Sequence, residues 1–187
     1  MKKIIFFLAA VLLTASAFSQ RASVAFGLKA GINISDFNDD AGTTGRRTGF
    51  HLGGLAHFHL NPNFAIQPEI VYSTQGAERV EGEYQINYIN IPMLFQYMTA
   101  SGFRLETGPQ IGVLTSAERE ESDGDVVNVK PDLRSSDISW AIGAGYLSRS
   151  GLGVDARYNI GLTDIRKGSP EWEHRVWQFG IFYQFRR

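Results

Sequence analysis

Six ionisable residues occupy the polar positions of stretches in which apolar and polar side chains alternate. Three are basic and three are acidic: Lys29, Glu69, Arg104, Glu106, Asp155 and Arg157. Successive side chains of a β-strand point to opposite faces, so all six are expected on the polar face of their strands. In a poorly hydrated interior such charges must be paired. We interpret them as a salt-bridged network that fills the interior; a narrow ion path and a catalytic carboxylate pair are the alternatives.

Other residue types that could do chemistry do not form a recognisable site. The chain has no cysteine and no Gly-x-Ser-x-Gly elbow, so neither nucleophile is indicated. His57 and His59 share one face, but a metal site needs three or four ligands, and we expect an ordinary polar rim. Residues 36–40 resemble the start of a calcium loop, yet its sixth and twelfth positions are Ala41 and Arg47 instead of glycine and glutamate. We predict no enzyme, no cofactor and no bound metal.

The elements that must position the charged residues are β-strands. In residues 152–163 every even position is apolar or aromatic and every odd one is glycine, polar or charged, which is the period of a strand. Similar patterns predict an all-β chain with eight strands, at residues 22–34, 48–60, 64–75, 83–98, 103–115, 136–149, 152–163 and 175–186. Eight is an even number, as single-chain bacterial outer-membrane barrels require.

The connections between these strands differ in length in a regular way. Residues 61–63, 99–102 and 149–151 are short and contain the Pro, Asn, Ser and Gly that hairpin turns need. The other four, residues 35–47, 76–82, 116–135 and 164–174, are longer and polar. Long and short connections alternate, so all the long ones lie at one end. This is typical of an eight-stranded antiparallel up-and-down transmembrane β-barrel, with short periplasmic turns and longer external loops.

The two faces of the strands support this interpretation. Aromatic residues gather towards strand ends on the apolar face, as expected of interfacial girdles. The girdle residues are Phe58, Phe64, Tyr97, Phe103, Trp140, Tyr146, Trp177, Tyr183 and Phe185. Most glycines of the strands fall on the polar face. An eight-stranded barrel has an interior just wide enough for side chains to fill, so inward glycines make room for long charged ones.

The N-terminus predicts export from the cytoplasm. Residues 1–19 have a basic start at Lys2 and Lys3, an apolar run and a small-residue cleavage site, so we predict a signal peptide cleaved before Phe18 or Gln20. No cysteine follows the site, which excludes a lipoprotein anchor. Residues 20–187 then form one domain in the cell outer membrane. Without the two lysines the formal charge moves from −1 to about −3, and no basic stripe supports nucleic-acid binding.

Three segments carry a resemblance to a known family. They are Gly27-x-x-x-Gly31, Gln67-Pro68-Glu69-Ile70-Val71-Tyr72-Ser73-Thr74-Gln75-Gly76 and Tyr88-Ile89-Asn90-Ile91-Pro92-Met93-Leu94-Phe95-Gln96-Tyr97. Together they resemble the outer-membrane β-barrel domain family of Bacteroidetes-type bacteria, often named "porin family protein" and similar in architecture to small barrels of the OmpA and OmpX type. The resemblance implies the fold and the outer membrane more than an activity. Many such barrels end in an aromatic residue, whereas here Arg186 and Arg187 follow Phe185.

Two prolines, Pro68 and Pro92, stand within strands that should be paired on both sides. Proline removes one donor from the ladder and is normally confined to edges or bulges. We therefore predict local bulges near both.

Several functions remain open from the sequence. The leading hypothesis is a structural or surface-interaction barrel with a filled lumen, and the alternatives are a narrow pore and an interfacial lipid-modifying enzyme. A soluble lipocalin-like barrel with an apolar interior is a further alternative for the fold. Expected partners are outer-membrane lipid and lipopolysaccharide and, during biogenesis, the barrel assembly machinery; the surface partner of the long loops is unknown. Acidic residues that could bridge divalent ions to lipopolysaccharide are Asp36, Asp39, Asp40, Glu118, Glu120, Glu121, Asp123, Asp125 and Asp132.

Overall fold

The computed structural model describes residues 24–38, 43–79, 82–120, 125–165 and 173–185. Its elements are β1 (Val24–Asn38), β2 (Thr43–His59), β3 (Phe64–Arg79), β4 (Gly82–Met98), β5 (Phe103–Glu120), β6 (Val126–Asn128), η1 (Lys130–Asp132), β7 (Ser136–Leu147), β8 (Leu152–Gly161) and β9 (Glu173–Gln184). The predicted signal peptide lies outside the described residues. Within them no helix is long and apolar enough to cross a membrane, a finding that does not bear on strands.

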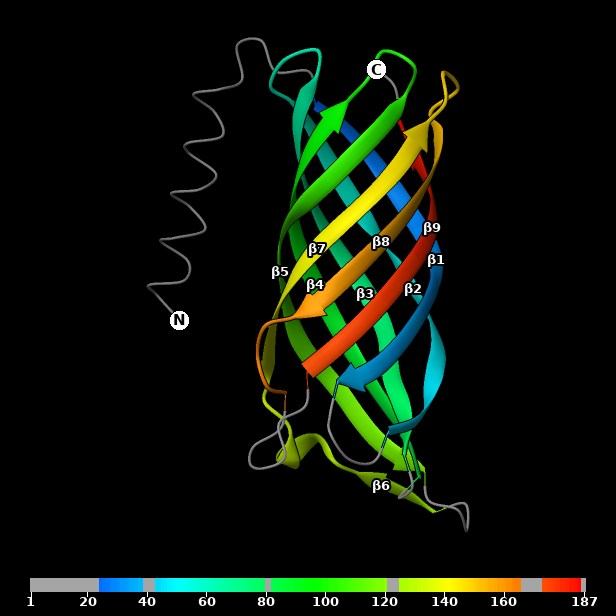
Figure 1. Ribbon diagram of the computed structural model, residues 1–187, viewed down its shortest axis with the longest axis vertical. Helices are drawn as coiled ribbons and strands as arrows, with labels where there is room; N and C mark the ends of the chain where they lie inside the picture. Colours follow the sequence, from blue (N-terminus) through cyan, green and yellow to red (C-terminus); the bar gives the residue numbers. More distant parts are fainter. Residues whose placement is uncertain (1–23, 39–42, 80–81, 121–124, 166–172, 186–187) are drawn as a thin grey trace.

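Eight of the strands close into an antiparallel up-and-down barrel (Figure 1). Neighbours along the chain pair in the order β4-β3-β2-β1-β9-β8-β7-β5, and the pairing of β4 with β5 closes the ring. The first and last strands are joined from Gly27 opposite Gln184 to Asn38 opposite Glu173. Closure leaves none of these eight strands with a free edge. A sheet that spans a membrane must be closed in this way, because the bilayer core has no water to pair with an open edge. The predicted eight-stranded fold is confirmed.

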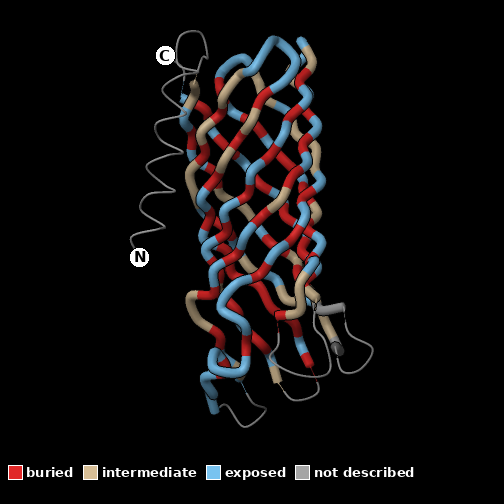
Figure 2. The backbone as a smooth tube through the Cα atoms, turned by 90° about the vertical axis from the view of Figure 1, so that its left-hand side faces the viewer, coloured by how far each residue is buried: buried red, intermediate tan, exposed pale blue. Residues whose placement is uncertain are grey.

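Buried and exposed residues alternate along the strands (Figure 2). The large side chains that point outward are apolar, such as Ile70, Ile142 and Ile181, each more than half exposed. The residues that point inward are largely polar or charged and are buried. A soluble barrel has the reverse arrangement, because an apolar exterior of this size is unfavourable in water. The lipocalin-like alternative is therefore wrong.

Paired glycines allow long side chains to cross the lumen. Gly31 on β1 stands directly opposite Gly180 on β9. A Cβ at Gly31 would collide with the backbone oxygen of Phe179 and lie 2.7 Å from the His51 ring. A Cβ at Gly180 would lie 2.9 Å from Oδ1 of Asp155 and 3.2 Å from Nε2 of His51. The two glycines thus leave the space that these inward side chains occupy.

The strands β3, β4 and β5 are longer than β7, β8 and β9 at the end opposite the short turns, and β3 and β5 also extend beyond their predicted ends at residues 75 and 115. They have 16, 17 and 18 residues, against 12, 10 and 12 in β7, β8 and β9. The prediction of a loop at residues 76–82 is wrong, because β3 and β4 stay paired up to Arg79 opposite Gly82. The reason is burial: inward-facing Ala77, Tyr84 and Ile86 belong to a small apolar core beyond the charged part of the lumen.

The third long connection supplies the other side of that core. It contains β6, which pairs with the outer end of β5, and the short helix η1. Val129 and Leu133 are buried against the strand residues, together with Ile165 from the connection after β8. The backbone N–H of Arg134 donates to the carbonyl of Ile165 at 2.7 Å, which ties the two connections together. We call Val129, Leu133 and Ile165 the outer cap.

The predicted bulges near Pro68 and Pro92 are absent from the described ladders. The register of β3 with β4 is the same at Pro68 opposite Met93 and at Val71 opposite Asn90. That of β4 with β5 is likewise unchanged on either side of Pro92. The fixed φ of proline fits an extended strand, so each proline loses one donor without shifting its neighbours. The register shifts instead lie between residues 43 and 51 of β2 and between residues 87 and 88 of β4.

Candidate functional site: the charge cluster of the lumen

The structure places all six ionisable residues inside the barrel. They come from four strands that are far apart in sequence: Lys29 on β1, Glu69 on β3, Arg104 and Glu106 on β5, and Asp155 and Arg157 on β8. Each is at most 8% exposed. Strand alternation explains the inward direction of each side chain, and closure of the ring brings the four strands around one lumen. We call these residues the charge cluster.

Arg157 is the centre of the charge cluster. Its Nη1 and Nη2 donate to Oε2 and Oε1 of Glu69 at 3.1 and 3.0 Å, which is a bidentate pair. Its Nε donates to Oε1 of Glu106 at 2.9 Å. Planar guanidinium groups suit such paired contacts, and charge-assisted bonds are about twice as strong as neutral ones. Arg157 therefore links β8 to β3 and β5 across the lumen.

Lys29 extends the cluster to the opposite wall. Its Nζ lies 2.9 Å from Oδ2 of Asp155 and 3.5 Å from Oε2 of Glu69. The contacts form one chain, in which Asp155 meets Lys29, Lys29 meets Glu69, Glu69 meets Arg157 and Arg157 meets Glu106. Positive and negative groups alternate along it. Buried charges need this close pairing, because the desolvation penalty otherwise exceeds the attraction between them.

Arg104 is held differently from the other five. Among the described residues it forms no ion pair within 4 Å, and its Nη1 donates to Oε1 of Gln96 at 3.4 Å. Its guanidinium carbon lies 5.2 Å from the centre of the Phe182 ring, a cation–π distance. Gln96 in turn donates through Nε2 to Oε2 of Glu106 at 2.8 Å. Arg104 therefore joins the cluster through an amide and an aromatic ring.

Neutral polar residues complete the filling of the lumen. Gln67 donates to Oε1 of Glu69 at 2.8 Å. On the other side of the cluster the amide of Asn33 donates to the hydroxyl of Ser73 at 2.9 Å, and its oxygen lies 2.8 Å from Nδ1 of His51. Alternation placed these residues on the polar face, but their partners depend on strand register, which the sequence pattern does not give. No group of three or more His, Cys, Asp or Glu among the described residues is placed to hold a metal ion.

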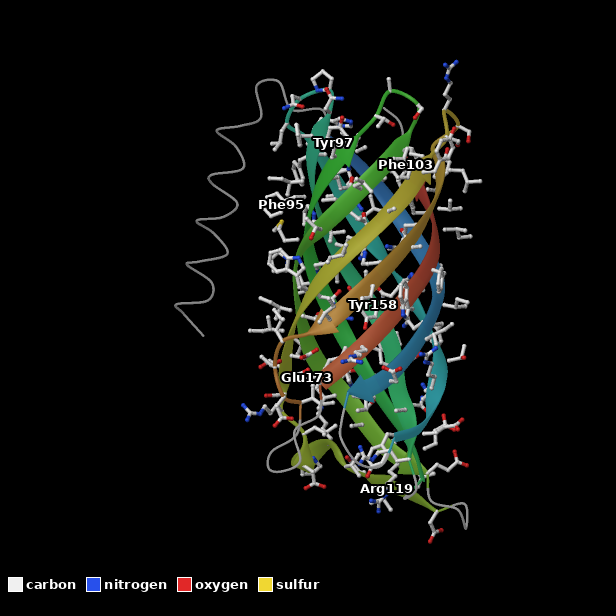
Figure 3. All side chains as sticks on the ribbon, viewed as in Figure 1. Phe95, Tyr97, Phe103, Arg119, Tyr158 and Glu173 are labelled. Carbon is white, nitrogen blue, oxygen red and sulfur yellow. The ribbon has the colours of Figure 1, made fainter. Side chains whose placement is uncertain are left out.

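The aromatic residues named from the sequence lie on the outer surface of the barrel. At the short-turn end they form contacting pairs, with ring centroids 5.4 Å apart for Phe64 and Tyr97 and 5.5 Å apart for Tyr183 and Phe185. Figure 3 labels Tyr97 and Phe103 near this end. Phe58 and Tyr146 are also near this end, and Phe58 is partly buried.

A second group of aromatic residues lies towards the loop end. The ring of Trp177 lies 4.6 Å from that of Tyr158, which Figure 3 also labels, and the indole N–H of Trp140 donates to Thr107 at 2.9 Å. Two belts separated by an apolar band are the arrangement that membrane interfaces favour.

Comparison with known proteins agrees with this architecture. The family model of the outer membrane protein β-barrel domain matches residues 17–167. The chain belongs to this family. It is an outer-membrane protein whose strands span the bilayer. Barrels of this kind have short turns on the periplasmic side. None of the curated proteins matches it.

Solved structures of small outer-membrane barrels have a similar fold. Neisserial surface protein A is 13% identical, with a TM-score of 0.57 over 89% of this chain and 100% of its own. Ail, the attachment invasion locus protein of Yersinia pestis, solved with the heparin analogue sucrose octasulfate, is 15% identical, with a TM-score of 0.56 over 87% and 99%. OprG from Pseudomonas aeruginosa is 12% identical, with a TM-score of 0.51 over 89% and 98%. At these identities the likeness concerns the fold.

Proposed function

We propose that this chain is a closed outer-membrane barrel that acts structurally or through its external surface, without conducting solutes and without catalysis. The observation that carries the proposal is the charge cluster, which joins β1, β3, β5 and β8 through Lys29, Glu69 and Arg157. A lumen crossed by paired charges offers a hydrated ion no continuous path. The outer cap, in which Leu133 and Ile165 are buried, adds a second obstruction towards the outside.

Electrical recording in planar lipid bilayers tests this proposal. The purified barrel is expected to give no steady, reproducible conductance steps. A variant that removes the centre of the cluster and also loosens the outer cap, Glu69→Ala with Glu106→Ala, Arg157→Ala and Leu133→Asp, is expected to give them, whereas the surface control Arg46→Ala stays silent. Regular steps from the unmodified protein would overturn the closed-lumen proposal.

A narrow ion path is the second candidate, and one observation favours it. Several buried polar atoms have no hydrogen-bond partner among the described residues, including the Tyr88 hydroxyl, the amide of Asn159 and Nδ2 of Asn90. Buried polar atoms normally form hydrogen bonds, so ordered water molecules are expected at these positions. Ordered water on the outer side of the charge cluster would shorten the part of the lumen that an ion must cross without water. The same recordings decide between the two, because the path predicts small steps that depend on the charge of the ion.

The absence of catalysis is also part of the proposal. The carboxylates Glu69 and Glu106 are both engaged by Arg157, which leaves neither as a free general base. The purified barrel is expected to leave labelled lipid A and phospholipids unchanged on prolonged incubation. A modified lipid that disappears with Glu69→Gln would overturn this expectation.

We also propose lipid and lipopolysaccharide as the contacts of the aromatic belts, and the barrel assembly machinery as the partner during insertion. Of the acidic residues expected in the loops, Glu118 and Glu120 lie instead in the extended end of β5, and Asp36 lies in β1. Asp39, Asp40, Glu121 and Asp123 lie outside the described residues. Divalent ions that bridge lipopolysaccharide phosphates would therefore meet acidic strand ends as well as loops. Omission of Mg²⁺ is expected to weaken binding of lipopolysaccharide to the purified barrel.

A further inference from the structure

Two histidines lie together inside the periplasmic end of the barrel. His57 and His59 are two residues apart on β2, just before the turn that leads to β3, and both point into the lumen. Their ring centroids are 4.5 Å apart, with the ring planes at 80°. His57 is completely buried, whereas His59 is partly exposed. The expectation of an ordinary polar rim is therefore wrong for His57.

Neighbouring hydrogen bonds define which nitrogen of His57 carries the proton. Glu69 is ion-paired with Lys29 and Arg157, so its oxygens accept hydrogen bonds, and the amide nitrogen of Gln67 donates to one of them at 2.8 Å. The oxygen of Gln67 must then face His57, and it lies 3.0 Å from Nδ1. An oxygen cannot donate here, so Nδ1 carries the hydrogen and Nε2 keeps its lone pair.

Both histidines present a ring nitrogen that the structure leaves unused. Nε2 of His57 and Nδ1 of His59 are buried and form no close hydrogen bond among the described residues, although the Gln96 side chain also interacts with the His57 ring. Buried ring nitrogens without a partner are rare, because a water or an ion usually satisfies them. Residues two apart on a strand project from the same face, so both imidazoles reach one volume of the lumen.

We propose that His57 and His59 bind one divalent transition-metal ion, of the Cu²⁺, Ni²⁺ or Zn²⁺ class, at the periplasmic end of the lumen. Imidazole nitrogen is a preferred ligand of these ions, and only the neutral ring binds them. A metal-bound histidine usually donates its second N–H to an oxygen that orients the ring, and Gln67 does this for His57. With two protein ligands the remaining positions belong to solvent, so the ion exchanges readily.

The surroundings of the pair permit a cation. The charge cluster, farther along the lumen, has three basic and three acidic residues and thus no net charge of its own. Arg104 is the cation whose charge acts on His57 and opposes a bound metal ion. Its guanidinium is engaged by Gln96 and the Phe182 ring, and its repulsion is a further reason for ready exchange of the ion. Partial exposure of His59 gives an ion access from the periplasmic opening.

Copper titration of the untagged barrel, folded in detergent micelles, tests the proposal. Calorimetry is expected to give one Cu²⁺ per chain, and the electron paramagnetic resonance spectrum is expected to have splitting from two nitrogens. His57→Gln and His59→Gln should each weaken binding by at least about tenfold. Gln67→Leu, which leaves both ligands in place, should weaken it by about 10- to 100-fold, as loss of an orienting partner does.

His51→Gln is the matched control. His51 is also buried on β2 and also has an unpartnered Nε2, but it has no second imidazole beside it. Copper affinity is expected to stay within about twofold in this variant, and circular dichroism confirms that each variant is folded. No binding by the unmodified protein, a spectrum without two nitrogens, or equal binding by the His57→Gln, His59→Gln double variant would overturn the proposal.

Discussion

Replacing Arg157 with methionine removes the centre of the charge cluster while keeping a long side chain in the lumen. The change eliminates three charge-assisted hydrogen bonds, two to Glu69 and one to Glu106. Glu69 keeps Lys29 at 3.5 Å and Gln67 at 2.8 Å, and Glu106 keeps Gln96 at 2.8 Å. Each carboxylate therefore retains one or two partners, but the interior acquires a net charge of about −1.

The expected loss in the free energy of unfolding is about 3–5 kcal/mol, the range found when one member of a buried ion pair is removed. Adding Glu69→Gln to Arg157→Met restores the charge balance and is expected to recover at least about 1 kcal/mol, because the two sites interact directly. The exposed pair of Arg46 and Asp36, with N and O atoms 3.2 Å apart, is the control. Arg46→Met should cost only about 0–1 kcal/mol.

Urea unfolding of the barrel in phosphatidylcholine vesicles measures these differences. Trp140 and Trp177 lie on the lipid face, so their fluorescence changes when the strands leave the bilayer. The slope of the transition should be the same in all variants, since the surface that unfolding exposes is similar. If Arg157→Met costs no more than Arg46→Met, or if Glu69→Gln makes the loss larger, the cluster is hydrated and the reasoning is refuted.

Three further perturbations probe other parts of the barrel. Ile142→Arg, at mid-strand on the lipid face, should lower the free energy of unfolding in a bilayer by about 2–4 kcal/mol, and a loss of only a few tenths would mean that the faces are reversed. Gly180→Val should cost about 1–3 kcal/mol in the same assay, because its side chain would meet Asp155 and His51; an unchanged stability would mean that the lumen has free space there. Leu133→Asp should loosen the outer cap, so protease cleavage between β5 and β7 should accelerate several-fold while the vesicle-embedded strands stay protected. Equal cleavage rates would show that the cap is not held by apolar packing.

The sequence pattern predicted the barrel well because its cause is local. Alternation with period two assigns each residue to a face without knowledge of its partners. Lys29, Glu69 and Arg157 fall on the polar face by this rule, and the structure has all three buried. The turns at residues 61–63 and 149–151 were also located, since Pro, Asn, Ser and Gly mark them. What alternation cannot give is the register between strands that are distant in sequence.

The parts that differ from the sequence-based expectations depend on such tertiary contacts. The ends of β3 and β4 looked like a polar loop because Gly76 and several charged residues interrupt the pattern, yet inward-facing Tyr84 and Ile86 hold them as strands. Contacts of Arg104 with Gln96 and Phe182 follow from register and the size of the lumen. The burial of His57 could have been anticipated from its inward position, but its unpartnered nitrogen could not.

Fluorescence quenching with brominated lipids is the most direct measurement of what covers the apolar outer face of the barrel. It distinguishes contact with hydrocarbon from contact with water. In the Trp172→Phe variant the signal comes from Trp140 and Trp177, which are 40% and 46% exposed on the outer surface. Lipids brominated along the acyl chain should quench both strongly, most of all when the bromine lies near the headgroup, while iodide in the water phase quenches little. Strong quenching by iodide and none by any brominated lipid would contradict a membrane-spanning barrel with its charges inside.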